Sequence, residues 1–262
     1  MKKVVVGMSG GVDSAAASLL LQRAGYEVIG VRIRTQASER TEKEYDQEES
    51  DAGKCAAALG IPFYVLDCSE CFHREVEEPF IQEYLKGRTP SPCTRCNHSM
   101  KWKGLMEAAE RFGADHVATG HYAEIIRPDN GRYTVKASET GKDQSYMLYR
   151  LSQEQLSKTL FPLGKLEKPE IRRIAEEAGI PVFSKPDSQE LCFLPDGDYA
   201  AFIKKQKPEE MPGPGYFVDK QGNILGTHKG IVSYTTGQRR GLGLPGKERF
   251  YVTEIRADRN AV

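Results

Sequence analysis

The sequence predicts an α/β fold: a doubly wound parallel sheet followed by a small, incomplete β domain. Short β-branched runs alternate with Ala- and Leu-rich or amphipathic segments between residues 3 and 178. Such alternation produces a parallel sheet with helices on both faces. After about residue 205 the composition shifts to proline and glycine, and short strand signals follow. This shift predicts a second, smaller domain.

The elements of the sheet follow from periodicity and from turn residues. Compact apolar runs predict strands over residues 3–7, 27–33, 61–66 and 115–118. Helices are predicted over residues 13–24, 74–86, 99–112 and 167–178. A further helix, entered from a charged loop at 39–51, is predicted to end near Gly60. An Asp-Asn-Gly turn predicts a hairpin of 124–127 with 132–136. Two prolines predict that residues 88–98 form no regular structure.

Two domains are expected from this reading, residues 1–205 and residues 206–262. In the second, strands are predicted at 216–219, 224–227 and 250–255. In the first, ligands of a parallel sheet bind beyond the carboxyl ends of the strands. The loops at 8–12, from 34 onward and at 119–122 are therefore expected to share one mouth.

Composition limits the class of protein. The chain has 262 residues, 39% of them hydrophobic and 28% charged. No apolar run approaches the ~20 residues of a membrane span, and the apolar start breaks at Ser9-Gly10-Gly11, so it is predicted as a buried strand rather than a signal peptide. We expect a cytoplasmic protein without membrane association. The net charge of zero gives no global basic footprint for a nucleic-acid partner, although basic residues cluster at 101–103, 172–173, 204–207 and 239–240.

A glycine-rich loop separates the first predicted strand from the first helix. It reads Ser9-Gly10-Gly11-Val12-Asp13-Ser14. The glycines permit tight turns that leave amide groups facing outward, and the helix N-terminus adds positive potential, so a phosphate is stabilised there. No Gly-Lys-Ser or Gly-Lys-Thr follows, which excludes the loop of kinase-like NTPases. An ordinary turn with Asp13 as helix cap is the alternative. The string is similar to that of the PP-loop pyrophosphatases, which split ATP into AMP and pyrophosphate.

Six cysteines without a secretion signal indicate metal binding or redox chemistry. Cys93 and Cys96 form a Cys-x-x-Cys beside the cations Arg95 and Lys101, which are expected to lower the thiol pKa. These two with Cys192 either hold an iron–sulfur cluster or include a sulfur-transfer pair. Cys68 and Cys71 repeat the spacing at a strand end. We interpret them, like Cys55, as structural.

The chain resembles the bacterial tRNA-specific 2-thiouridylases over essentially its whole length. The strings that carry the resemblance occur in order: Gly7–Ser14, Gly87–Pro92 leading to Cys96–Asn97, Ala118–Tyr122, Lys142–Tyr146, Lys185–Gln189 leading to Cys192–Phe193, and Thr236–Gly243. The resemblance implies the PP-loop, adenine nucleotide alpha hydrolase-like fold, with the catalytic domain at 1–205 and a central β domain at 206–262. We expect this chain to lack the C-terminal β-barrel that follows in the family.

The resemblance also implies a reaction: ATP adenylates a tRNA uridine, at the wobble position, and a cysteine persulfide supplies sulfur to carbon 2. Cys192 is implied as persulfide carrier and Cys96 as the second catalytic cysteine, able to form a disulfide with it. The implied ATP-binding residues are Gly7, Met8, Ser9, Gly10, Gly11, Val12, Asp13, Ser14, Ile33 and Gly120. Those implied to meet tRNA are Ser91, Pro92, Cys93, Lys142, Asp143 and Gln144. For His121 two roles are open: contact with the base or a phosphate of the tRNA, or a place in the core.

Mg²⁺ is expected with ATP, although the sequence contains no dedicated metal-binding motif. The implied partners are tRNA and a persulfide donor protein. Many members carry Asp where this chain has Cys93, which keeps the iron–sulfur alternative open with Cys93, Cys96 and Cys192 as ligands. A PP-loop ligase acting on a small molecule is the other alternative; it gives Cys96 and Cys192 no role.

Overall fold

The computed structural model describes residues 1–35, 42–187, 191–194, 196–245 and 249–262. It divides into two compact units, one made of residues 1–75 and 93–189 and the other of residues 76–92 and 190–262. We describe each unit by itself. Of the helices in the described ranges, none combines the length and the apolar character that crossing a bilayer requires.

The first unit is built on a five-stranded sheet, and its four longest strands are parallel neighbours in the order β3-β2-β1-β4. The strands are β1 (Lys3–Gly7), β2 (Glu27–Arg34), β3 (Phe63–Asp67), β4 (His116–Thr119) and the short β7 (Thr159–Leu160), which pairs in parallel with β4. The predicted doubly wound parallel sheet is confirmed. β1 lies in its middle because a run of valines suits a strand that is covered on both faces.

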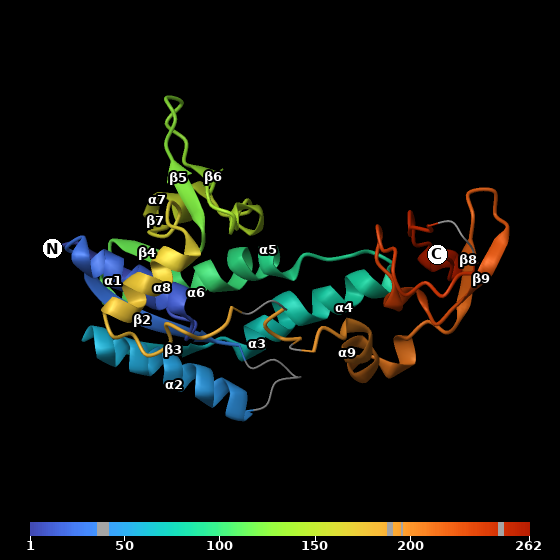
Figure 1. Ribbon diagram of the computed structural model, residues 1–262, viewed down its shortest axis with the longest axis horizontal. Coiled ribbons are helices and arrows are strands. Elements are labelled where there is room, and N and C mark those ends of the chain that lie inside the picture. The colour runs from blue at the N-terminus through green and yellow to red at the C-terminus, as the bar shows by residue number, and fades with distance from the viewer. Residues whose placement is uncertain (36–41, 188–190, 195, 246–248) are drawn as a thin grey trace. The chain divides into compact units, whose positions relative to one another are not determined.

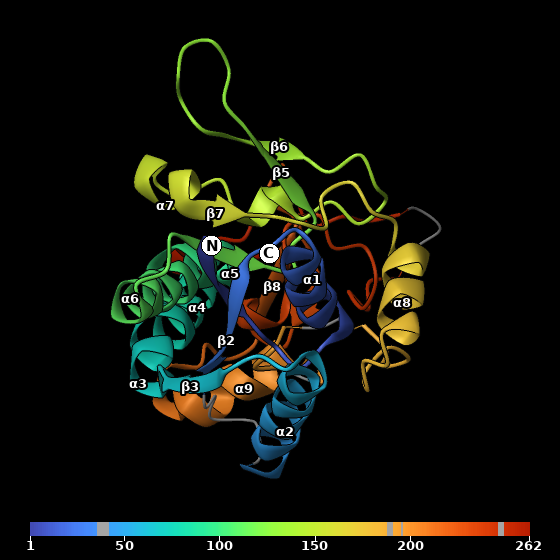
Figure 2. The same ribbon diagram turned by 90° about the vertical axis from the view of Figure 1, so that its left-hand side faces the viewer.

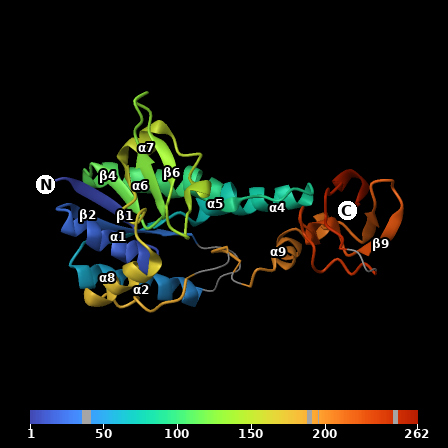
Figure 3. The ribbon, with the colours of Figure 1, turned by 45° about the horizontal axis from the view of Figure 1, so that its top comes forward.

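Helices cover both faces of this sheet. On one side lie α1 (Val12–Arg23), α2 (Glu42–Leu59) and α8 (Lys168–Glu177), and on the other lies α6 (Trp102–Phe112) (Figures 2 and 3). Side chains of β1 alternate: Val5 packs in the cluster that contains Trp102 and Leu105, whereas Val4 and Val6 pack with Leu21 of α1. The remaining helices of this unit are α3 (Ser69–Phe72), α5 (Pro92–Cys96) and α7 (Gln153–Lys158); the first residue of α5, Pro92, is counted with the other unit.

A hairpin of β5 (Ala123–Ile126) and β6 (Thr134–Ala137) extends away from the parallel sheet (Figure 1). The predicted turn at residues 129–131 joins its strands, so the hairpin prediction is confirmed. The second unit contains α4 (Glu78–Leu85), α9 (Tyr199–Gln206), β8 (Gly215–Val218) and β9 (Ile224–His228). β8 and β9 pair antiparallel, and Phe217, Tyr234, Leu242 and Val252 form an apolar cluster beside them.

Three sequence predictions are corrected. Residues 92–96 form α5 and continue as a π-helical turn at Asn97–Lys101. Pro92 begins this helix instead of breaking it, because the first helical position needs no N–H donor. Residues 250–255 form no strand, although Val252 still buries its side chain. Helix α2 already begins at Glu42, inside the predicted charged loop; residues 36–41 of that loop lie outside the described residues.

Candidate active site

The glycine loop lies between the end of β1 at Gly7 and the start of α1 at Val12. Gly10 has φ +80°, a conformation that side chains disfavour, and this turns the chain sharply into the helix. Gly11 is the N-cap of α1, and no side chain caps this helix end. The amide groups of the first turn have no acceptor within a helix, so this end of α1 is suited to bind an anion.

Hydrogen bonds within the loop fix its shape. The Ser9 amide donates to Ser14 Oγ at 3.2 Å, and Ser14 Oγ donates to the Gly11 carbonyl at 3.1 Å. From the neighbouring strand β2, the Arg32 guanidinium donates to the Ser9 carbonyl at 2.5 Å. The loop is thus held by its own serines and by a cation from the next strand.

Gly120, after β4, lies directly against the start of α1. A Cβ at Gly120 would stand 2.7 Å from both Asp13 C and Ser14 N, closer than real Cβ atoms come to other atoms. Only glycine therefore fits here without moving the loop. The contact shows that the loops after β1 and β4 meet at one edge of the sheet, as the topology predicts.

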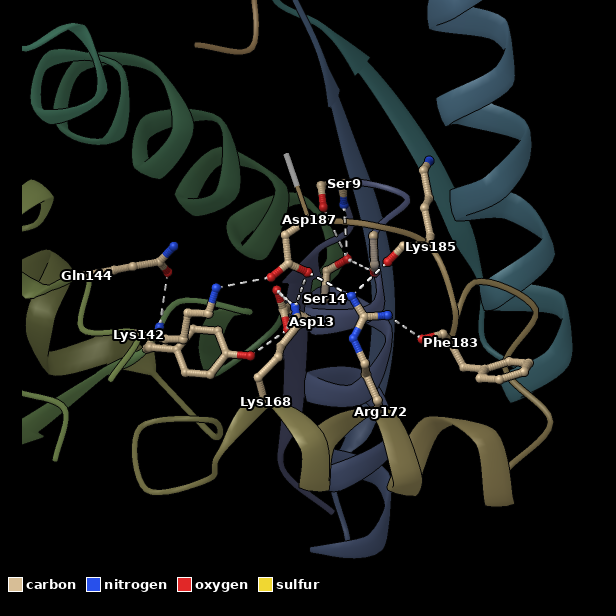
Figure 4. Close-up of polar contacts among 12 residues, drawn as sticks. Ser9, Asp13, Ser14, Lys142, Gln144, Lys168, Arg172, Phe183, Lys185 and Asp187 are labelled. Atoms are coloured by element: carbon tan, nitrogen blue, oxygen red, sulfur yellow. Dashed lines mark hydrogen bonds and ion pairs between the residues drawn. The ribbon is translucent and has the colours of Figure 1, made fainter. Parts of the chain in front are cut away.

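A lysine from α8 reaches the carboxylate at the start of α1. Lys168 Nζ lies 2.7 Å and 2.8 Å from the two carboxylate oxygens of Asp13 (Figure 4). The Tyr122 hydroxyl donates to the same carboxylate at 2.7 Å. Burial, and then the bond to Asp13, raises the pKa of Tyr122, so this phenol stays a donor. Asp13 is oriented by two donors from distant parts of the chain.

The Asp187 carboxylate lies within ion-pair distance of three cationic side chains. Its carboxylate lies 2.8 Å from Lys168 Nζ, 3.0 Å from Arg172 Nη2 and 3.3 Å from Lys142 Nζ (Figure 4). Burial works to raise the pKa of Asp187, but hydrogen bonds and charges of Lys168 and Lys142 hold it below its ordinary value. Asp187 therefore stays ionised and links the segment after β6 to helix α8.

The segment at 183–187 is tied to both α8 and the glycine loop. Arg172 donates to the Phe183 carbonyl at 2.6 Å and to the Lys185 carbonyl at 2.9 Å. Lys185 Nζ lies 2.8 Å from Asp51 of α2 and 3.4 Å from the Gly10 carbonyl. Cations from this segment and from α8 thus surround the anion-binding helix end.

Lys168 was not identified from the sequence, and Tyr122, Arg172, Lys185 and Asp187 were noted there only within longer strings or clusters. One local signal for Lys168 does exist. It occupies the first turn of α8, directly before Pro169, yet it is largely buried. A cation at a helix N-terminus is disfavoured by the helix dipole, so a buried lysine there indicates a partner elsewhere.

The remaining predicted nucleotide residues surround the loop. Met8 and Val12 are buried, and the Met8 sulfur fills the space that a side chain at Gly30 would need. Gly7 ends β1 against Leu105, and Ile33 lies on β2 next to Gly104. These positions shape the walls of the loop rather than supply charge.

Cys93 and Cys96 lie on α5, one helical turn apart. Burial raises the pKa of both thiols, and the nearby Lys101 ammonium offsets only part of that effect. The expected lowering of these pKa values by cations is therefore wrong, because desolvation outweighs the charge of Lys101. Both groups are therefore protonated thiols at neutral pH.

The segment that follows the β5–β6 hairpin contacts both the loop of Tyr122 and the helical run that contains Cys96. The Gln144 side chain accepts from the Tyr122 amide at 3.2 Å, and Asn97, next to Cys96, donates to the Met147 carbonyl at 3.2 Å. Asp143 bonds the Ser138 and Ser145 amides, and Lys142 is exposed. The structure thus links this predicted tRNA-binding segment to the loop of Tyr122 and to the helix of Cys96.

His121 is buried among aromatic rings. It bonds Thr119 Oγ1 at 2.7 Å, and its ring lies 5.7 Å from Trp102 and 6.2 Å from Phe161 between centroids. Burial holds the pKa of His121 well below its ordinary value, so the ring is neutral. This placement favours the core-histidine interpretation that the sequence left open.

Cys192, Ser91 and Pro92 belong to the second unit, where Cys192 is exposed. Ser188 and Gln189, predicted to precede it in the family string, lie outside the described residues. Within the described ranges, no group of three or more His, Cys, Asp or Glu side chains is arranged to hold a metal ion.

Comparison with known proteins places the whole chain in one family. The family model described as "tRNA methyl transferase HUP domain" matches residues 2–196, and "tRNA methyl transferase PRC-barrel domain" matches residues 200–262. The tRNA-specific 2-thiouridylase MnmA of Lachnoclostridium phytofermentans is 48% identical over 270 residues, spanning 100% of this chain and 75% of the relative. That of Clostridium acetobutylicum is 47% identical over 271 residues with the same shares. The chain belongs to the tRNA-specific 2-thiouridylase MnmA family.

Proposed function

We propose that this protein catalyses the ATP-dependent 2-thiolation of a uridine in tRNA, at the wobble position. The observation that carries the proposal is the glycine loop at the uncapped start of α1, surrounded by Lys168 and Lys185. It lies in the same unit as the Cys93–Cys96 helix, in a chain of this family. A phosphate-binding loop explains the use of ATP, and the thiols explain the use of sulfur.

ATP fits the residues that are present. The loop from Ser9 to Ser14 offers backbone amides and a hydroxyl, which are the donors that phosphate oxygens accept. Gly120 leaves room beside them that a larger residue would fill. Lys168 and Lys185 add positive charge, and we propose that Mg²⁺ accompanies the nucleotide. When bound, ATP supplies AMP as the leaving group for the uridine 2-oxygen.

The cysteines divide the sulfur chemistry between them. We assign the persulfide to Cys192, whose terminal sulfur attacks carbon 2 as AMP departs with the oxygen. The Cys96 thiolate then attacks Sγ of Cys192; the sulfur–sulfur bond breaks, 2-thiouridine is released and a Cys96–Cys192 disulfide remains, which external thiols reduce. The raised pKa of Cys96 keeps it protonated until this step. The persulfide comes from a donor protein, and the compartment is the cytoplasm.

Lys142, Asp143 and Gln144 are proposed to meet the tRNA, together with Ser91, Pro92 and Cys93. Lys142 is exposed and lies at the cation cluster around Asp187, so its ammonium is available to a phosphate. Gln144 is tied to Tyr122, which bonds Asp13. Contact with RNA at this segment is therefore coupled by hydrogen bonds to the nucleotide loop.

The test combines the full chain with ATP, Mg²⁺, a persulfide donor and a tRNA transcript, and measures 2-thiouridine and AMP. Cys96→Ser and Cys192→Ser are expected to abolish 2-thiouridine, whereas Cys55→Ser, at a buried position in α2, is expected to retain it. AMP formation that needs no tRNA and survives both serine variants would instead indicate a small-molecule ligase.

An iron–sulfur variant of the reaction is distinguished in the same experiment. Protein purified without oxygen is examined for visible absorbance near 400 nm, a region typical of iron–sulfur clusters. Thiolation by colourless, iron-free protein would exclude a cluster with Cys93, Cys96 and Cys192 as ligands. Activity that appears only with iron and sulfide would favour it.

A further inference from the structure

A second Cys-x-x-Cys, formed by Cys68 and Cys71, lies at the carboxyl end of β3 in the first unit. The sequence indicated a structural role for these residues, and the proposed reaction does not use them. The Cys68 amide donates to the Arg34 carbonyl at 2.8 Å, and Asp67 accepts from the Ser69 amide at 2.9 Å. The pair is thus held at the same edge of the sheet as the glycine loop.

Both thiols open onto one surface hollow. It has a volume of about 590 Å³, and its lining includes Cys68, Cys71, Asp67, Arg74, Gly104 and Glu107. Both cysteines are half-buried, whereas Cys55 is fully buried. A small reagent in the hollow can therefore meet both sulfur atoms, and a thiol kept only for packing has no need of such access.

The two thiols have different electrostatic surroundings. Arg74 Nη2 lies 4.0 Å from Cys71 Sγ, and a cation at that position stabilises a thiolate. At Cys68, burial and then the charges of Cys71, Glu107 and Asp67 raise the pKa of the thiol. The thiol beside the guanidinium, Cys71, is therefore assigned the first attack, and Cys68 the second.

The spacing allows the two sulfur atoms to join. The Phe72 amide donates to the Cys68 carbonyl at 2.8 Å, so the chain from Cys68 forms one helical turn. Residues three apart on such a turn have Cβ atoms ~5–6 Å apart, which a small side-chain and backbone adjustment brings into the range of a disulfide. Two cysteines in a loop of this length are a common form of redox dithiol.

The pair also lies close to the proposed catalytic helix. Cys68 Sγ is the neighbour of Gly104 on α6, 3.8 Å from the Cβ position of that glycine. Helix α6 continues the helical run that begins with α5 and contains Cys96. Charge on Cys71 and Cys68 also contributes to the raised pKa of Cys96, which is consistent with that proximity.

We propose that Cys68 and Cys71 form a redox-active dithiol that reacts with disulfides entering the hollow. The Cys71 thiolate attacks one sulfur of a disulfide RSSR, which forms a mixed disulfide and releases one thiolate RS⁻. The Cys68 thiol loses its proton and attacks Cys71 Sγ, which releases the second RS⁻. The protein pair is oxidised by two electrons to a Cys68–Cys71 disulfide, and the external disulfide is reduced to two thiols. This site goes beyond the thiolation reaction and does not depend on it.

The experiment equilibrates the reduced full chain with glutathione buffers of increasing oxidised fraction, alkylates the remaining thiols and digests with trypsin. Cys55, Cys68 and Cys71 share the tryptic peptide at 55–74, whereas cleavage after Arg95 separates Cys93 from Cys96. A Cys68–Cys71 disulfide therefore lies within one peptide, in which fragmentation places the alkyl group on Cys55, and a Cys93–Cys96 disulfide joins two peptides. The expected product is the first of these, formed reversibly, with Cys55 alkylated throughout.

Variants separate the roles of the two thiols. In Cys68→Ser, a glutathione adduct is expected to accumulate at Cys71, and in Cys71→Ser the adduct at Cys68 is expected to form at least about tenfold more slowly. Arg74→Gln is expected to slow the reaction of Cys71 severalfold, whereas Arg111→Gln, whose side chain lies over the Phe112 ring, is expected to leave it unchanged. The proposal is overturned if both thiols remain reduced at every glutathione ratio in folded protein, or if Cys71 reacts no faster than Cys55.

Discussion

Lys168 Nζ lies 2.7 Å and 2.8 Å from the two carboxylate oxygens of Asp13, although the residues are 155 positions apart in the chain. The pair joins the first turn of α8 to the first turn of α1. Since α1 begins at the glycine loop, the position of α8 and the position of the anion-binding amides are set together.

Replacing Lys168 is expected to damage both ATP use and stability. Lys168→Met leaves the Asp13 carboxylate without its cation, so kcat/KM for ATP should fall about 100-fold. The free energy of unfolding should fall by about 1–2 kcal/mol, less than for a fully buried pair because Asp13 is about a third exposed. AMP release and denaturant unfolding followed by fluorescence of the single tryptophan, Trp102, measure the two effects.

The matched control is Lys165→Met. Lys165 also forms an ion pair, with Glu124 at 3.5 Å, but its side chain is 76% exposed. Exposed pairs contribute little, so unfolding should change by less than about 0.5 kcal/mol and ATP use should be unaffected. Equal damage from both substitutions would show that the Asp13 contact has no special role.

Gly120→Ala tests the fit between the loops after β1 and β4. The added Cβ would lie 2.7 Å from the backbone of Asp13 and Ser14, so the glycine loop must shift. ATP affinity is expected to fall at least about tenfold, with about 1–3 kcal/mol lost from the free energy of unfolding. Gly141→Ala is the control, since no atom lies within 4 Å of its Cβ position. Nucleotide titration and denaturant melts compare them, and wild-type affinity in Gly120→Ala contradicts the contact.

Reaction of Cys96 with iodoacetamide should accelerate as the pH rises above 7. Burial raises its pKa, so the thiolate is scarce at neutral pH and its fraction grows about tenfold for each pH unit below the pKa. Lys101→Gln removes the cation that partly offsets burial and is expected to move the profile to higher pH, whereas Lys103→Gln should not. Alkylation rates of the peptide that contains Cys96 report the profile; a rate already constant at pH 7 contradicts the assignment.

His121 predicts a loss of stability in mild acid. Its pKa is depressed in the folded state, so below about 6.5 the unfolded chain binds a proton that the folded chain does not. The contribution of neutral His121 to the free energy of unfolding should therefore be complete above that pH. As the pH falls, the free energy of unfolding should decrease by up to about 1.4 kcal/mol per pH unit. Trp102 lies next to His121 and reports this unit. His121→Asn should flatten the slope between pH 6.5 and 5; an unchanged slope would assign it to other groups.

Lys142 is expected to contribute a phosphate contact. Lys142→Ala should weaken tRNA binding severalfold and reduce the slope of log affinity against log salt concentration by about one. Its ion pair with Asp187 is half-exposed, so stability should change little. The exposed Lys158 serves as control, and filter binding at several salt concentrations gives both quantities. An unchanged salt slope in Lys142→Ala would remove this segment from the RNA interface.

Sequence reasoning succeeded where local chemistry decides the structure. The valine run of β1 and the glycines after it require a buried strand and a tight turn, and both are present. It failed where a proline begins a helix, as Pro92 does, and at residues 250–255, which form no strand although Val252 is buried and bonds the backbone of Gly237 and Gln238. The ion pair of Lys168 with Asp13 was also missed, because charge pairing between distant segments leaves no periodic trace in the chain.

The division of the chain has a consequence for its biosynthesis. Helix α4 belongs to the unit completed by residues 190–262. Its Phe80 ring meets Phe193 edge to face, and its Tyr84 ring stacks on Tyr199. During translation these rings emerge more than a hundred residues before their partners. A nascent chain halted before residue 190 thus exposes the apolar side chains of this helix, which either bind chaperones or promote aggregation. For the same reason, expressing the nucleotide unit alone requires excising residues 76–92, not merely shortening the chain.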